Sequence, residues 1–397
     1  MSASKSSLII ILGALTAFGP MSIDMYLPSL PALQQALATD AGSVQFTLAS
    51  FFIGLTVGQV IYGPVSDRFG RKPPLYAGLL LYVLASIGCA FAPSIQSLIG
   101  LRFVQALGAC AGMVIARAMV RDLFDAQTSA RVFSLLVLVM GVAPILAPLA
   151  GGYLLTALGW QAIFGALALF GLACLLAVAW GLPETRSSAQ ATEPLRLGTA
   201  LRGYAFLLKD RLFVGYALAG GVVFGGMFAY ISGSPFVFIE LHGVSPDSYG
   251  WLFGINAFGL ILASQVNRRL LSIWSADAIL SAALTVAAVF GLLVFAVGAT
   301  GFGGLTGLLL SLFCFIASLG FTQANSMAGA MAHHGPRAGS ASALLGTLQF
   351  AVATLAGISV GALDDGTARP MTLVIAVCAV VALLIYRGLV RGRAVEA

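Results

Sequence analysis

One carboxylate, Asp24, stands well inside a long apolar stretch of the sequence, and one arginine, Arg102, stands at a similar depth in another. A charge in the hydrocarbon of a membrane is costly, so such residues face the protein interior and pair with each other. Burial disfavours the charged form of a carboxylate, whereas a nearby arginine favours it. We therefore predict that Asp24 binds and releases a proton beside Arg102. The alternatives are a static ion pair at a helix end and an arginine that extends to the membrane interface.

The composition indicates the class of protein in which these two residues lie. Of 397 residues, 59% are hydrophobic and only 9% are charged, whereas roughly a quarter are charged in a soluble protein. This excludes a soluble enzyme, a nucleic-acid-binding protein and a disordered chain. Twelve helices of about 20 residues use roughly 240 residues and leave no room for a sizeable soluble domain. The sequence predicts an all-α membrane protein, and a transporter or channel rather than an enzyme.

Twelve apolar runs are long enough to cross a bilayer as helices. They cover residues 8–28, 44–65, 74–92, 97–118, 131–155, 161–182, 212–239, 248–266, 277–299, 303–325, 339–362 and 370–390. Nearly all basic residues fall in the tails and in alternate loops, on the same side as Lys5, and Arg369 alone falls on the other side. Positive loops stay in the cytoplasm, so we expect both termini to be cytoplasmic.

The longest connection, residues 183–211, divides the chain into two sets of six runs, 1–182 and 212–397. Short patterns repeat between the two sets: Asp67-Arg68 is echoed by Asn267-Arg268, and Phe103-Val104-Gln105-Ala106 by Phe321-Thr322-Gln323-Ala324. Two six-helix bundles joined by a cytoplasmic linker resemble the architecture of the major facilitator superfamily. We expect two pseudo-symmetric bundles with these boundaries.

The loop after the second run has a spacing that a merely basic loop does not explain. It reads Gly63-Pro64-Val65-Ser66-Asp67-Arg68-Phe69-Gly70-Arg71-Lys72. This resembles the G-x-L-x-D-R-x-G-R-K signature of the major facilitator superfamily. We expect Gly63 to let two helix backbones approach closely, and Asp67 to accept hydrogen bonds from a helix N-terminus or an arginine. The gating set predicted here is Gly63, Asp67, Arg68, Gly70 and Arg71, with Asp122 as the partner of Arg71.

Three further segments resemble drug:proton antiporters of that superfamily. The fifth run contains Gly141, Pro144, Pro148, Gly151 and Gly152, similar to the G-x-x-x-G-P-x-x-G-G antiporter motif. The stretch from Arg102 to Gly108 is similar to R-x-x-Q-G-x-G, with Ala106 in place of a glycine. Asp24-Met25-Tyr26-Leu27-Pro28 is similar to the end of the first helix in bicyclomycin- and chloramphenicol-resistance (Bcr/CflA) transporters. The prolines are expected to bend the fifth helix, and the glycines to permit close packing.

Uncharged polar side chains within the runs are the candidates for contact with a solute. They are Tyr26, Gln45, Gln59, Tyr230, Asn256, Gln323, Asn325 and Gln349. Interleaved with 26 phenylalanines, they suit an amphipathic molecule of moderate polarity. The alternative for each is a hydrogen bond between helices.

Several functions find no support in the residues. No glycine precedes any of Lys5, Lys72 and Lys209, so the P-loop pattern that binds ATP is missing. The five cysteines lie singly in apolar runs, so we expect no disulfide, metal or cofactor. His333 and His334 are expected to lie solvated in a loop.

The first hypothesis is therefore an inner-membrane exporter of small drugs that exchanges them for protons and works as a monomer with lipid, drug and protons as its partners. An importer working by symport or facilitated diffusion is the alternative, and a passive channel is the third.

Overall fold

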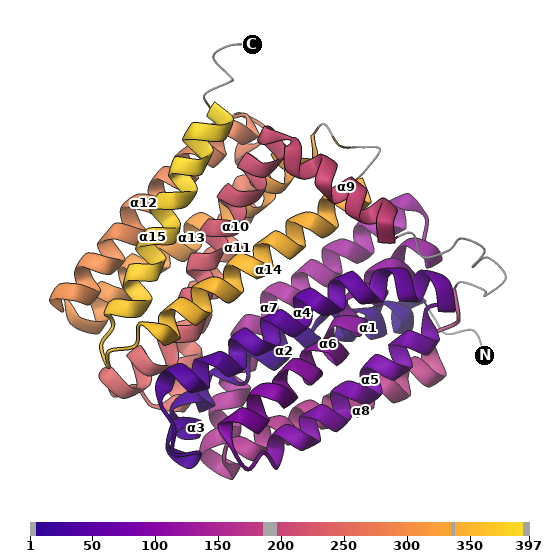
Figure 1. Cartoon of the computed structure of the whole chain (residues 1–397), viewed down its shortest axis with the longest axis horizontal. Coiled ribbons are helices and arrows are strands. Elements are labelled where there is room, and N and C mark those ends of the chain that lie inside the picture. The colour runs from indigo at the N-terminus through magenta and orange to yellow at the C-terminus, as the bar shows by residue number, and fades with distance from the viewer. Residues whose placement is uncertain (1–4, 186–196, 333, 335–337, 392–397) are drawn as a thin grey trace. The chain divides into compact units, whose positions relative to one another are not determined.

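The computed structural model describes residues 5–185, 197–332, 334 and 338–391, and every regular element within these ranges is helical (Figure 1). The first elements are α1 (Lys5–Thr16), α2 (Phe18–Asp24), a 3₁₀ turn (Leu27–Ser29), α3 (Leu30–Ala36), α4 (Ala41–Phe69), α5 (Lys72–Ala90), α6 (Ile95–Leu123), α7 (Ala126–Leu158) and α8 (Trp160–Gly181). The later ones are α9 (Leu197–Lys209), α10 (Arg211–Pro235), a π-helix (Phe236–Leu241), α11 (Pro246–Leu270), α12 (Ala276–Thr300), α13 (Gly304–Met331), α14 (Ala338–Ala362), α15 (Arg369–Ile385) and a second π-helix (Tyr386–Arg391).

The helices long enough to cross a membrane match the apolar runs of the sequence. Eleven helices of the described chain are long and apolar enough to span a bilayer, and the number becomes twelve when the bent pair Lys5–Thr16 and Phe18–Ala36 is one span. The prediction of an all-α fold with twelve spans is thus confirmed. Several helices extend beyond their apolar run because polar residues such as those at the end of α4 continue the helix.

The first span is broken near its middle. Helix α1 ends at Thr16 and α2 begins at Phe18, and the two segments are bent by 41°. Pro20 has no N–H with which to bond the carbonyl four residues earlier, which is that of Thr16. The Thr16 hydroxyl turns back to donate to the Gly13 carbonyl at 2.7 Å. The break puts Asp24 at the end of a short, separate helix.

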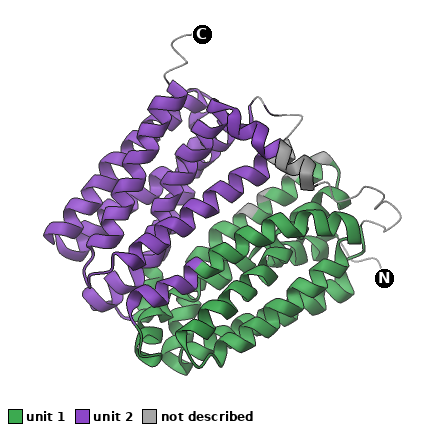
Figure 2. Ribbon diagram, in the orientation of Figure 1, with its two compact units in different colours: residues 1–39, 50–196, 246–251 green, residues 40–49, 197–245, 252–397 purple. Residues whose placement is uncertain are grey.

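Contacts divide the chain into two compact units (Figure 2). Unit 1 comprises residues 1–39, 50–196 and 246–251, and unit 2 comprises residues 40–49, 197–245 and 252–397. Each unit therefore includes a short segment from the other half of the sequence, taken from the first turns of α4 or of α11.

Unit 1 is packed around α6 through small residues. A side chain at Gly108 would lie 2.6 Å from the Gly78 carbonyl oxygen of α5 and 2.6 Å from the Tyr82 nitrogen. Between membrane helices there is no hydrophobic driving force, so such close backbone contacts supply the association energy. Tyr82 also packs edge-to-face on Phe18 of α2, with ring centroids 4.6 Å apart.

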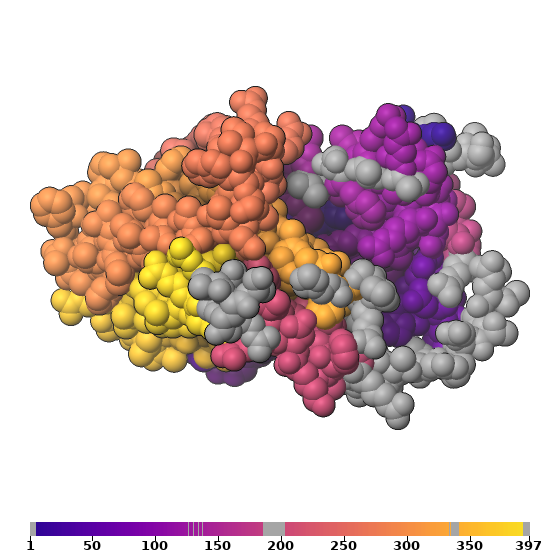
Figure 3. All heavy atoms as spheres, turned by 90° about the horizontal axis from the view of Figure 1, so that it is seen from above, coloured from indigo at the N-terminus to yellow at the C-terminus, as the bar shows by residue number. Residues whose placement is uncertain are grey.

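In unit 2, glycines of α10 likewise allow close contact with neighbouring helices. A side chain at Gly225 would lie 2.8 Å from Val352 of α14, and one at Gly233 would lie 2.7 Å from Met371 of α15. Helix α15 also packs on α12, and in the space-filling view of Figure 3 the yellow atoms near the C-terminal end of the described chain lie against orange atoms. These glycines allow α14 and α15 to approach α10 closely.

The glycines of α6 offer a matched test of this packing. We expect Gly108→Val to lower the free energy of unfolding of the purified protein by about 1–3 kcal/mol, because backbone atoms cannot move aside for the added side chain. Gly100→Val on the same helix is the control, since no described atom lies within 4 Å of a side chain added there. Equal melting temperatures for the two variants in detergent would contradict the packing.

Candidate functional site

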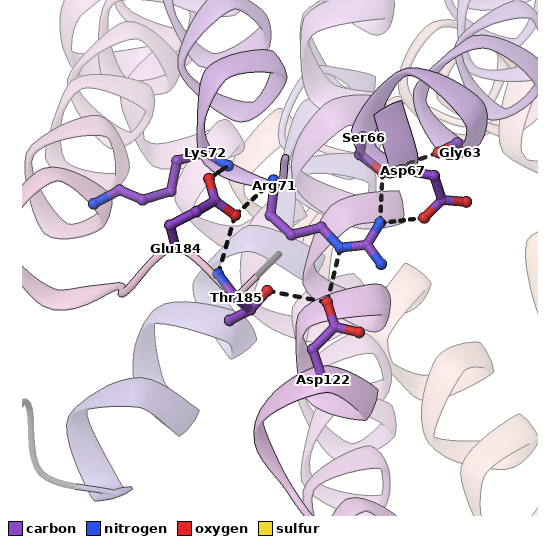
Figure 4. Close-up of polar contacts among 8 residues, drawn as sticks. All are labelled: Gly63, Ser66, Asp67, Arg71, Lys72, Asp122, Glu184 and Thr185. Carbon is purple, nitrogen blue, oxygen red and sulfur yellow. Dashed lines mark hydrogen bonds and ion pairs between the residues drawn. The ribbon is translucent and has the colours of Figure 1, made fainter. Parts of the chain in front are cut away.

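The sharp turn between α4 and α5 begins the first candidate site. Gly70 has a φ of +86°, in the left-handed region that favours glycine. The turn directs the buried side chain of Arg71 back between two helix ends. Its Nη1 donates to Asp67 Oδ1 at 2.7 Å, and its Nε donates to Asp122 Oδ2 of α6 at 2.8 Å (Figure 4). The contact predicted between Arg71 and Asp122 is confirmed.

The electrostatics of this cluster favour a charged arginine. Burial alone would lower the pKa of Arg71, but hydrogen bonds and charge from Asp122 and Asp67 outweigh it and raise the pKa. The two carboxylates differ in burial, because the Asp122 side chain is 24% exposed and that of Asp67 is 54% exposed. Asp122 is therefore the anchored partner, and Asp67 is the one that solvent reaches.

Glu184, after the end of α8, adds a contact that the sequence analysis did not assign. Its carboxylate accepts the backbone N–H groups of Arg71 at 2.8 Å and Lys72 at 2.9 Å, where α5 begins (Figure 4). An anion at a helix N-terminus satisfies unpaired N–H groups and the helix dipole. Thr185 donates to Asp122 at 3.0 Å. No local pattern in the sequence names this partner, because Glu184 and Arg71 lie far apart in the sequence.

One member of the predicted gating set, Gly63, is placed differently from expectation, and another, Arg68, lies on the surface. No described atom lies within 4 Å of a side chain added at Gly63, so the close backbone approach predicted there is wrong within the described chain. Its carbonyl instead accepts the Ser66 hydroxyl at 3.0 Å. Arg68 is exposed, and its guanidinium lies 5.3 Å from the Phe69 ring centroid.

The second candidate site surrounds Arg102 on α6. This side chain has no exposed surface. Its guanidinium lies 4.5 Å from the ring centroid of Tyr26 and 4.3 Å from that of Phe51. It donates to the Gln105 side chain and, at 3.0 Å, to the backbone carbonyl of Ser22. Cation–π contacts of this kind stabilise a desolvated charge, and the arginine does face the interior of unit 1.

Hydrogen bonds continue from Arg102 around a closed ring that joins α2, α5 and α6. Gln105 donates to the Ser86 hydroxyl at 2.8 Å, and Ser86 donates to the Tyr82 carbonyl at 2.7 Å. The Tyr82 hydroxyl lies 2.7 Å from the Ser22 hydroxyl, which returns the ring to the residue whose carbonyl Arg102 binds. Only the Nε of Arg102 is left without a partner in this network.

Asp24 lies two residues beyond Ser22 and is 5% exposed. The ion pair predicted between Asp24 and Arg102 is wrong for this structure, since the hydrogen bonds of Arg102 go to an amide and a backbone carbonyl. The aromatic faces and these two oxygens stabilise the cation without a carboxylate. The two groups nevertheless share one turn of backbone.

The glycines of the antiporter motif approach this turn. Helix α7 runs through Pro144 and Pro148 without interruption. A side chain at Gly151 would overlap the backbone of Met25, next to Asp24, and one at Gly152 would overlap the backbone of Pro246 at the start of α11. The predicted close packing is confirmed at these two glycines. It ties α7 to the end of α2.

The candidate solute contacts fall into two groups. Several are buried and already hydrogen-bonded to a neighbour: Asn256 donates to Tyr230 at 2.9 Å, Asn325 donates to Asn267 at 2.8 Å, and Gln45 accepts from Ser232 at 3.3 Å. These contacts match the alternative of bonds between helices. Gln59, Gln323 and Gln349 are half-buried, and the last two are bonded to each other at 2.9 Å. Tyr26 is buried against Arg102.

His334 is placed differently from the solvated loop expected for it, whereas His333 lies outside the described residues. His334 is 8% exposed, and its Nε2 lies 2.8 Å from Asp210 Oδ2. Burial raises the pKa of Asp210, but backbone N–H groups of Leu212 and Phe213 and the contact with His334 outweigh it and lower the pKa. In the described part of the chain, no group of three or more His, Cys, Asp or Glu side chains could hold a metal ion.

Comparisons with known proteins agree on one family. The sequence profile of the Major Facilitator Superfamily matches residues 12–357. The chain is 39% identical to the uncharacterized MFS-type transporter YdgK of Bacillus subtilis, over 98% of this chain and 96% of that one. It is 33% identical to the bicyclomycin resistance protein homolog of Haemophilus influenzae, over 97% of each chain.

A shorter match and a solved structure extend the comparison. The chloramphenicol resistance protein of Pseudomonas aeruginosa is 32% identical over 70% of this chain and 65% of its own length. A bacterial homolog of the human lysosomal transporter Spinster has the same fold, with a TM-score of 0.79 at 15% identity over 98% of this chain and 97% of that one. The resemblance stated from the motifs is confirmed.

Glu184 allows a test of the first site that needs no transport assay. We expect Glu184→Ala to lower the free energy of unfolding by about 1–2 kcal/mol, because two N–H groups at the start of α5 lose their acceptor. Thermal unfolding in detergent measures this. Asp364→Ala, which removes an exposed carboxylate with one 3.4 Å contact, is the control. A Glu184 variant no less stable than this control would show that the contact contributes nothing.

Proposed function

Because this chain belongs to the Major Facilitator Superfamily, we propose that it exports small amphipathic antibiotics, of the bicyclomycin and chloramphenicol type, across the bacterial inner membrane in exchange for protons. The names of two relatives support the class of solute. The exchange with protons rests on one observation, which is the buried carboxylate of Asp24 on the same turn as the carbonyl that holds Arg102.

Asp24 is the proposed proton carrier. A buried carboxylate without a hydrogen-bonding cation is most stable when neutral, and the structure gives Asp24 no bond to Arg102. When the proton leaves, the guanidinium can exchange the Ser22 carbonyl for the Asp24 carboxylate two residues away. Each proton that enters the cell gains about 2.3 kcal/mol per 100 mV of membrane potential. This energy would drive the solute outward.

The contacts of Arg102 would couple this exchange of partners to a movement of the end of α2. Tyr26 contacts the guanidinium and lies two residues after Asp24. A movement of the α2 end toward Arg102 would therefore change the cation's aromatic and carbonyl contacts together. Because Gly151 of α7 touches the backbone beside Asp24, that movement would also shift α7. In our proposal the proton state of Asp24 is thus coupled to the position of a spanning helix.

The cluster around Arg71 is the proposed latch of alternating access. Asp122, Glu184 and Thr185 fix Arg71 to the ends of α6 and α8. Asp67 joins the same arginine from α4 with its side chain 54% exposed. We propose that Asp67 changes partners between two states while the others keep theirs.

Replacement of Asp24 tests the coupling. An amide cannot titrate, so Asp24→Asn should abolish chloramphenicol efflux driven by a pH gradient in proteoliposomes, while binding or downhill movement survives. Asp365→Asn, an exposed carboxylate between α14 and α15, should behave as the parent. Substrate-induced proton release, followed with a pH-sensitive dye, is the second readout. Normal release from Asp24→Asn would move the coupling elsewhere, with Glu240 of the first π-helix as the next candidate.

Replacement of Asp67 tests the latch. Asp67→Asn should reduce the initial rate of efflux by about tenfold, because an amide loses the charge-assisted bond to Arg71. Membrane insertion and thermal stability should stay close to those of the parent, since Asp122 still holds the arginine. A variant that transports at the parental rate would remove the gating role from this residue.

A further inference from the structure

Helix α6 carries two further arginines that the sites above do not use, Arg117 and Arg121. Arg117 lies about 22 Å along the helix from Arg102, toward the end that holds Asp122. From residue 101 to residue 120, it is the one exposed side chain of α6, and all the others are buried or half-buried. In the most enclosed part of this helix, the exposed side chain is therefore a positively charged one.

Arg117 differs from Arg71 and Arg102 in its contacts. Arg71 has two carboxylates, and Arg102 has an amide, a carbonyl and aromatic faces. No hydrogen bond or ion pair joins the Arg117 guanidinium to any residue that the structure describes. The carboxylates of Asp67 and Asp122, at the nearby helix ends, are engaged with Arg71. The charge is thus available to a molecule that reaches it.

The helical period places Arg117 on a definite side of α6. Gly108 faces α5, and nine residues later at 100° per residue Arg117 points to the opposite side. Cys110 packs against Gly58 of α4, and Arg117 follows two turns further on that stripe. Helix α6 also contacts α1, α2 and α7. A helix with neighbours on so many sides has little surface left for lipid.

The apolar runs of the sequence contain few acids that could balance this charge. Of the twelve apolar runs, only two contain a carboxylate: Asp24, which is buried, and Asp277, which stands at the first position of its run. The carboxylates at the nearby helix ends, Asp67 and Asp122, are bonded to Arg71, so the exposed Arg117 attracts negative and repels positive solutes.

We propose that Arg117 lies on the path of the solute and makes this transporter reject lipophilic cations in favour of neutral and anionic molecules. The inference rests on the proposed export function and specifies the charge of its substrates. A cationic solute that passed within several ångströms of the guanidinium would meet a repulsion that a neutral solute of equal size does not. Selection would thus act on charge rather than on shape.

A neutral and a cationic probe test whether Arg117 selects solutes by charge. Proteoliposomes with the purified protein are loaded with chloramphenicol, which is neutral, or with tetraphenylphosphonium, a lipophilic cation. We expect the parent to export only the first. Arg117→Gln should gain measurable efflux of the cation beside that of chloramphenicol, and Arg117→Lys should keep the parental ratio of cation to neutral efflux. Arg211→Gln, which removes an exposed arginine at the start of α10, is the control and should also keep it.

A binding measurement separates this inference from the proposed function. Equilibrium dialysis of tetraphenylphosphonium against each purified protein needs no transport, and Arg117→Gln should bind the cation about tenfold more tightly than the parent. Equal binding and an unchanged efflux ratio would overturn the role of Arg117, as would parental export of the cation. If the parent exports neither probe but Arg117→Gln gains cation binding, the export function fails and the charge selection stands.

Discussion

The fully buried guanidinium of Arg102 is the group whose stabilisation depends most on the surrounding helices. In a membrane, water cannot solvate Arg102, so unit 1 must supply every contact that stabilises the charge. The structure meets this with two aromatic faces, one amide and one backbone carbonyl. These partners come from α2, α4 and α6, and the ring of bonds through Ser86 and Tyr82 adds α5. The positions of four helices therefore depend on one cation.

The same constraint explains why the two clusters of unit 1 differ so much. Arg71 lies at a helix turn and is held by ionised carboxylates, which are acceptable there because solvent reaches Asp67. Arg102 lies within the apolar part of its helix and is held by neutral groups. Two buried ions would each have to lose their hydration, which is costly even for a good pair. A neutral surrounding for Arg102 leaves Asp24 able to change its protonation, which suits the proposed exchange.

Unit 2 has no comparable buried charge among its described residues. Where the sequence repeat replaces Asp67 by Asn267, the amide bonds to Asn325 at 2.8 Å. Tyr230 and Asn256 form a second neutral pair, with Tyr230 stacked on Phe253. Amide pairs join helices without any proton to exchange. In the proposed mechanism, proton chemistry therefore belongs to unit 1, and unit 2 contributes packing and polar contacts.

The sequence by itself determined the elements and the family, whereas the tertiary structure decided which polar groups meet. Apolar runs of the right length dictate spanning helices, because backbone groups in hydrocarbon must bond within the helix. Each run appears as a helix except the first, which appears as a bent pair of helices. From the sequence, Asp67 is expected to accept a hydrogen bond from an arginine, and Arg71, four residues further on, supplies it because the contact is local. The partners of Arg102, the cap from Glu184 and the contact of His334 with Asp210 join residues far apart in the chain. The exposure of Arg117 also depends on how neighbouring helices pack, which no local pattern encodes.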